Sequence, residues 1–130
     1  MKRTGSLAGV VMLFLLGCGG AGSPGGGAPQ YSCDVTSAQV HYCTEWNWGN
    51  LPQQAVDSFK MCTNGTAGTA CTTTGTVVGH CALTYAIGTG NFSATIYYYS
   101  GDAATAKTAC ESNNKSEHGT TTTAVWTPGG

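Results

Sequence analysis

Seven cysteines in a chain of 130 residues are the feature that most constrains its fold. Six lie in its central and C-terminal parts: Cys33, Cys43, Cys62, Cys71, Cys81 and Cys110. They contain no C-x-x-C pair and match no zinc-binding spacing, so we expect no metal site. An even set of cysteines in a small chain predicts three disulfides, as in proteins of oxidising compartments. The seventh, Cys18, stands apart near the N-terminus.

The composition explains why such a chain needs covalent support. Only 8% of its residues are charged, far below the roughly 25% of ordinary soluble domains. Small neutral residues take their place, and large apolar side chains are few. The length suits one domain, whose hydrophobic core is marginal without cross-links.

The first 17 residues have the pattern of a secretory signal. Lys2 and Arg3 precede an apolar run from Leu7 to Leu16. This run is too short for a transmembrane helix, which needs about 20 residues. It ends in Leu15-Leu16-Gly17-Cys18, which resembles the lipobox of bacterial lipoproteins. The alternative is an ordinary signal peptide that happens to contain a cysteine.

The lipobox resemblance implies three regions. Residues 1–17 are a signal peptide that is cut off, and Cys18 receives a diacylglyceryl group that binds the membrane. Residues 18–30 comprise this cysteine and a Gly/Pro-rich tether, and residues 31–130 form the domain. Gly19 replaces the Asp that often retains lipoproteins in the inner membrane, which favours the outer membrane. The chain is then periplasmic or exposed on the cell surface.

Removal of the signal changes the charge balance. Without Lys2 and Arg3 the chain keeps three lysines against six acidic residues, a net charge of −3, and no arginine. Nucleic-acid binding needs several basic side chains to neutralise phosphates. We therefore expect neither a nucleic-acid partner nor electrostatic docking on anionic lipid.

Hydrophobic patterning predicts a small α+β domain. Residues 39–46, 76–87, 92–99 and 121–127 alternate as strands, and 76–99 read as a hairpin. Residues 50–62 and 102–113 read as helices, capped by Asn50 and by Ser100 or Asp102. The expected fold is an antiparallel sheet of three to four strands with two short helices, stapled by disulfides.

The predicted elements form two similar halves, each with a cysteine on a strand and another on a helix. Cys43 and Cys62 would correspond to Cys81 and Cys110, which favours the pairs Cys43–Cys62 and Cys81–Cys110 and leaves Cys33 with Cys71. Six cysteines allow fifteen connectivities, so the pairing stays open. Alternation also places Cys43 opposite Tyr42, which this pairing does not explain without a bulge.

Several short motifs carry a second resemblance: 43–46 (CTEW), 78–81 (VGHC), 96–99 (IYYY), 109–110 (AC) and Trp126. In these the region 31–127 resembles a small six-cysteine domain secreted by environmental bacteria. That family has no assigned activity, so the resemblance implies no functional residues.

No pattern predicts an enzyme. His41 and His80 are expected on outward strand faces and His118 in a loop, with no carboxylate spaced to complete a site. Glu45 could act as one member of a glycosidase pair, but its partner is not identifiable. No nucleophile elbow occurs. We expect no catalytic residue and no cofactor.

Aromatic side chains offer the best candidate for binding. Trp46 and Trp48 lie two residues apart beside polar neighbours, an arrangement with which many proteins grip sugars. Tyr97 and Tyr99 form a similar pair. The alternative is that these rings pack within the domain. The sequence thus predicts a non-catalytic envelope or cell-surface lipoprotein that binds a partner or supports structure. The second hypothesis is a glycan-binding module or a hydrolase accessory.

Overall fold

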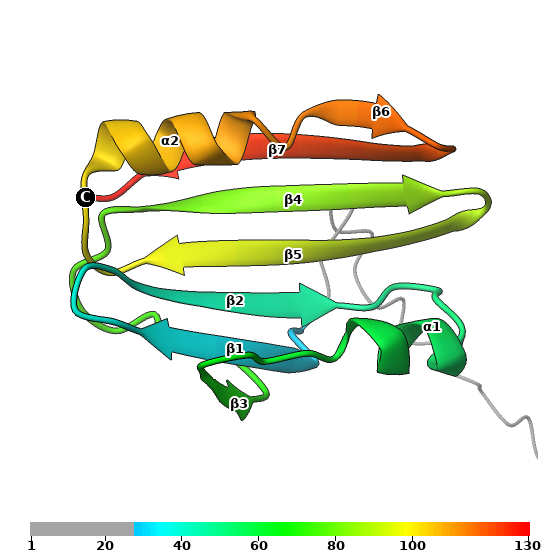
Figure 1. Cartoon of the computed structure of the whole chain (residues 1–130), viewed down its shortest axis with the longest axis horizontal. Coiled ribbons are helices and arrows are strands. Elements are labelled where there is room, and N and C mark those ends of the chain that lie inside the picture. The colour runs from blue at the N-terminus through cyan, green and yellow to red at the C-terminus, as the bar shows by residue number, and fades with distance from the viewer. Residues whose placement is uncertain (1–27) are drawn as a thin grey trace, which may run out of the picture.

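A computed structural model describes residues 28–130 of the chain. These residues form one seven-stranded antiparallel sheet and two short helices (Figure 1). The elements are β1 (Tyr31–Thr36), β2 (His41–Asn47), α1 (Gln53–Phe59), β3 (Thr66–Gly68), β4 (Gly79–Ile87), β5 (Gly90–Tyr98), α2 (Ala103–Glu111), β6 (Lys115–Glu117) and β7 (Thr120–Pro128). The strand order is β3-β1-β2-β5-β4-β7-β6.

The predicted fold class is confirmed in outline, but the expected number of strands was wrong. Three strands were missed: β1, β3 and β6. β3 and β6 have three residues each, too few to show alternation, and both lie at the edges of the sheet. Short edge strands are a common way to limit pairing with other chains. The predicted signal peptide, Cys18 and most of the tether lie outside the described residues.

The register of the sheet shows which side chains share a face. Cys33, Thr44, Ile96 and Cys81 stand side by side across four neighbouring strands. Because side chains alternate along a strand, Cys33 and Cys81 point to one face and Cys43 points to the other. Both helices cover the first of these, which we call the helix face (Figure 1). The second is the open face.

The disulfides follow from this division. Cys33 bonds Cys62 and Cys81 bonds Cys110, so each joins the helix face to a helix or to the segment that follows it. Cys43 bonds Cys71 on the open face, where it holds the loop between β3 and β4. The expected pair Cys81–Cys110 is confirmed, while Cys43–Cys62 and Cys33–Cys71 were wrong. No bulge is needed, because Cys43 uses the open face.

The sheet is symmetric about its central β2–β5 pair. On one side lie β1 and then β3, and on the other lie β4 and then β7, with β6 added at the edge. Each half runs as two paired strands, a helix and a strand that returns beside the first. The helices lie diagonally opposite each other in Figure 1, as a two-fold axis normal to the sheet requires. Cys33, in the unpredicted β1, is therefore the counterpart of Cys81.

Two clusters of buried side chains lie on the helix face. One gathers Leu83, Ala94 and Ala124 around the Cys81–Cys110 bridge under α2. The other packs Val56 of α1 against Trp48 and Phe92. α2 begins as predicted at Asp102, whose carboxylate accepts a hydrogen bond from Thr105 N at 2.7 Å. α1 begins later than predicted, with Pro52 as its N-cap and no side-chain capping bond.

Candidate functional site

The two tryptophans expected to form a sugar platform lie mainly in the interior. Trp48 is 5% exposed and packs with Val56 and Phe92. Trp46 is half-buried and contacts both clusters. Their rings are stacked, with centroids 6.1 Å apart and planes inclined by 10°. Core packing therefore accounts for Trp48, whose ring has almost no surface for a ligand to contact.

A different set of aromatic rings is partly exposed on the helix face. Tyr42 of β2, Tyr98 of β5 and Trp126 of β7 form a row, with ring centroids 6.3 and 5.7 Å apart. Gly79 of β4 makes this row continuous, because a Cβ there would overlap the Trp126 ring. We call these three rings the aromatic strip. Each ring is half-buried, and burial, with Tyr42 nearby, raises the pKa of the Tyr98 hydroxyl.

The strip lies beside the cluster under α2, in an uncharged part of the sheet. In β1, β2, β4, β5 and β7, no residue that points to the helix face is charged. Sequence reasoning missed the strip because it requires the register of three separate strands. Gly79, a glycine within an alternating strand, was the one available signal, since such a glycine marks a close approach by another group.

The acidic and histidine side chains of the central strands lie instead on the open face. His41 Nε2 lies 3.0 Å from the Asp34 carboxylate, and its ring packs on Tyr99 with centroids 4.5 Å apart. The Tyr99 hydroxyl donates to the carbonyl of Thr72 in the loop between β3 and β4. These contacts join β1, β2 and the end of β5 to the loop.

Glu45 lies at the centre of a second group of contacts to the same loop. Its Oε2 accepts from Cys71 N at 3.1 Å, and its Oε1 accepts from the Tyr97 hydroxyl at 3.0 Å. Burial, followed by the charge and the hydrogen bond of Glu45, raises the pKa of Tyr97 to about 12. His80 packs beside Tyr97, with centroids 5.8 Å apart. One oxygen of Glu45 thus fastens the loop, and the other bonds Tyr97 of the neighbouring strand β5.

The remaining acidic side chains are exposed and have local partners. Asp57 accepts from Gln53 at 2.8 Å, and Glu111 and Glu117 pair with Lys107 and Lys115. His118 lies in the β6–β7 turn, where its φ is 50°. Within residues 28–130 no three His, Cys, Asp or Glu side chains are arranged to hold a metal ion.

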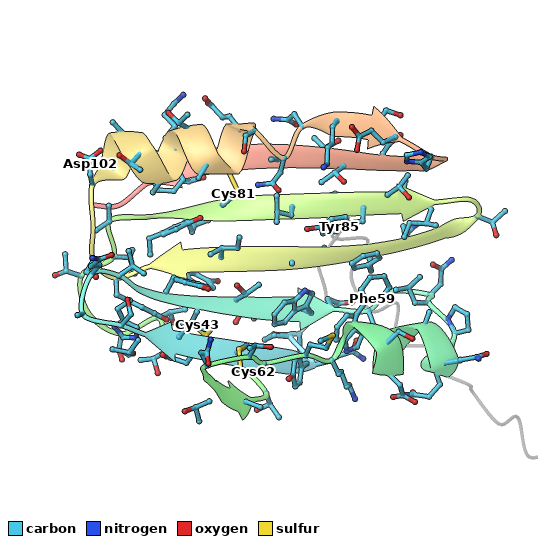
Figure 2. The ribbon with its side chains drawn as sticks, viewed as in Figure 1. Cys43, Phe59, Cys62, Cys81, Tyr85 and Asp102 are labelled. Atoms are coloured by element: carbon cyan, nitrogen blue, oxygen red, sulfur yellow. A yellow bond between two sulfur atoms is a disulfide. The ribbon has the colours of Figure 1, made fainter. Side chains whose placement is uncertain are left out.

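A groove of about 600 Å³ separates α1 from the β4–β5 turn. Its lining is mainly apolar and includes Leu51, Pro52, Ala55, Phe59 and Ile87. Phe59, labelled in Figure 2, packs against Phe92 with centroids 5.3 Å apart yet stays 44% exposed. Sequence reasoning predicted a helix over 50–62 but gave no sign that part of its apolar surface stays uncovered.

The described residues also show how the tether reaches the domain. Gln30 N donates to the Trp46 carbonyl at 2.8 Å, and Gln30 Oε1 accepts from Trp48 N at 2.9 Å. Asn47 Nδ2 donates to the Ala28 carbonyl at 3.0 Å. The predicted lipidation site, Cys18, lies outside the described residues. No helix within 28–130 has the length and apolar character to cross a membrane.

Comparison of the chain with protein-family models, with curated proteins and with solved structures finds no match.

Proposed function

We propose that this chain is a lipid-anchored, non-catalytic module of the bacterial envelope that acts by binding a partner or as a structural component. One observation carries the proposal: six of the seven cysteines are joined in three disulfides, which leaves Cys18 as the odd cysteine. Three disulfides in a small domain suit an oxidising compartment. Cys18 stands at the end of the lipobox-like segment, where an unpaired thiol is the one that receives lipid.

Two further observations support the non-catalytic part of the proposal. Glu45, the strongest candidate for an acid catalyst, has both carboxylate oxygens hydrogen-bonded within the domain, one to Cys71 N of the loop and one to the Tyr97 hydroxyl of β5. His41, the histidine with a carboxylate partner, sits in a contact network that joins three strands to the same loop. The hydrolase alternative thus has less support, since these groups already have structural roles.

The test of the anchor is membrane fractionation with intact-mass measurement. The wild-type chain should pellet with membranes and carry the mass of a diacylglyceryl group, while Cys18→Ala should lose both. Ser23→Ala, in the tether, is the matched control and should behave as wild type. The mature, unreduced protein should show no free thiol. A Cys18→Ala chain that still pellets wholly with membranes would contradict the anchor.

The aromatic strip supports a second candidate, a glycan-binding module. Flat, half-buried rings in an uncharged surface suit neutral sugars, which pack on aromatic faces. Tyr42→Leu keeps apolar volume but removes a ring and a hydroxyl, and should weaken binding to insoluble peptidoglycan or polysaccharide several-fold. Val125→Ser, on the open face, should not change binding. Equal binding by both variants, with folding checked by circular dichroism, would remove the strip from consideration.

A further inference from the structure

Two exposed apolar side chains lie close together where α1 ends. Among residues 28–130 the large hydrophobic residues that are exposed are Val40, Phe59, Met61 and Val125. Two of these, Phe59 at 44% and Met61 at 69% exposure, lie two residues apart where α1 ends. Phe59 also lines the apolar groove. Neighbouring exposed apolar groups beside an apolar groove are more informative than single ones, since isolated exposed residues are ordinary.

The tether joins the domain at this same end. Gln30 bonds Trp48, and Asn50, two residues farther on, lines the groove. Asn50 Oδ1 also accepts from Asn91 N at 2.8 Å, which brings the β4–β5 turn to the same place. Figure 2 shows Phe59 in the half of the sheet that carries α1 and Asp102 at the opposite end.

The length of the tether keeps this end near the lipid. Nine residues lie between Cys18 and Ala28, and Gly-rich linkers that span ten Cα–Cα steps have an end-to-end distance of roughly 16–19 Å. A nine-residue strand such as β4 is roughly 30 Å long. The α1 end is therefore the part of the domain with the highest effective concentration at the membrane.

We infer that the α1 end of the domain docks on the bilayer surface, with Phe59 and Met61 in the lipid interface and the groove facing the acyl region. This inference rests on the lipid anchor of the proposed function. The surface has no net charge to attract charged lipid headgroups, because the ionisable side chains beside it, Asp57 and Lys60, carry opposite charges. Lys60 can lay its aliphatic stem on lipid while its ammonium group stays in water. The docking is therefore hydrophobic and insensitive to salt.

Native methyl groups provide the test. Met61 is the only methionine after Cys18, so methyl labelling of methionine and valine in the mature, lipidated chain gives an unambiguous probe. The chain is placed in nanodiscs of phosphatidylcholine with and without spin-labelled lipid. The Met61 methyl signal should broaden several-fold more than those of Val40 and Val125. These two are matched controls, with exposures of 40% and 57%, in the β1–β2 turn and on the open face.

Each result separates docking from anchoring. Intact mass reports the lipid on Cys18, and a chain without it would remove the anchor and the docking together. A lipidated chain in which Met61, Val40 and Val125 broaden equally would leave the anchor in place but overturn the docking. In Phe59→Ser/Met61→Ser, broadening at Val56 within α1 should fall to the level of Val40, and raised salt should leave the wild-type pattern unchanged. A wild-type pattern lost in salt would contradict a hydrophobic contact.

Discussion

The two halves of the sheet use the same plan with different means of support. In each, a disulfide with a sequence separation of 29 joins the first strand to the helix or the segment after it. The second half has three nine-residue strands and a bridge that is 0% exposed. The first half has strands of six, seven and three residues. It also has a second disulfide, Cys43–Cys71, and its Glu45 bonds both the loop after β3 and Tyr97 of the neighbouring β5.

This difference shows that a cross-link can replace part of the apolar burial that longer strands provide. Long strands bury enough side chains under α2 to form an aliphatic cluster. Short strands bury less, and the first half relies on stacked aromatic rings and on a loop fastened across its open face. Apolar burial stabilises the folded state, whereas a disulfide mainly restricts the unfolded chain. The two halves therefore draw on different contributions to stability.

The largest expected effect comes from removing one bridge at a time. The three loops have almost the same length, so loop entropy gives each about 3–4 kcal/mol. Cys81→Ala/Cys110→Ala should cost the most, about 5 kcal/mol, because it also leaves a cavity in the buried cluster. Cys33→Ala/Cys62→Ala should cost the least, since Cys62 is only half-buried. Urea unfolding measures all three, and equal costs would mean that burial around the bridge contributes nothing.

Truncating one core residue in each half gives the next largest effect. Trp48→Ala should lower the free energy of unfolding by about 4 kcal/mol and Leu83→Ala by about 3 kcal/mol, as for large buried side chains elsewhere. Both residues are at most 5% exposed. Thermal unfolding followed by circular dichroism measures the loss. A Trp48→Ala chain with unchanged stability would contradict its place in the core and return Trp48 to the candidate binding residues.

The second half was the more predictable from the sequence. The nine-residue strands β4, β5 and β7 alternate long enough to reveal their period, and Asp102 caps α2 where expected. In the first half, β1 has six residues and was not predicted. Because β1 was not predicted, Cys33 was not placed on a strand. The sequence therefore indicated two similar halves, but with Cys43 in place of Cys33 as the counterpart of Cys81. A disulfide partner depends on which face a strand presents, and that depends on register.

The candidate surfaces were less predictable than the fold. Two tryptophans two positions apart, Trp46 and Trp48, suggested a binding platform. The partly exposed rings come instead from three strands that lie far apart in the sequence and meet only in the folded sheet. The exposure of Phe59 depends on where α1 ends and on the distance to the β4–β5 turn. Local patterns indicate which residues share a face, but they do not show how much of that face a neighbouring element covers.

Alkaline pH should weaken the junction of the two halves, where Tyr97 of β5 bonds Glu45 of β2. In the folded chain the pKa of Tyr97 is about 12, compared with 10.0 for an ordinary tyrosine, because of burial and then Glu45. A raised pKa gives stability that is fully present below pH 10 and is lost as pH rises toward 12. Absorbance at 295 nm should show this late-titrating phenol. Burial also raises the pKa of Tyr98, so Tyr97→Phe should reduce the late phase by the amplitude of one phenol, and Glu45→Gln should lower the pKa of Tyr97. A late phase of unchanged amplitude in Tyr97→Phe would contradict the assignment.

Acid should produce the smallest difference, and in the second half. The pKa of Asp102 is lowered from its ordinary value of 3.8, chiefly by the hydrogen bond from Thr105 N at the start of α2. A lowered pKa gives stability that is present above pH 3.8 and is lost as pH falls through the folded value. α1, which begins at Pro52 without a side-chain cap, has no such dependence at its N-terminus. Asn also caps helices but does not ionise, so in Asp102→Asn the melting temperature should fall less between pH 5 and pH 3 than in wild type. Equal falls would mean that the Asp102 cap contributes nothing measurable to the acid sensitivity of the second half.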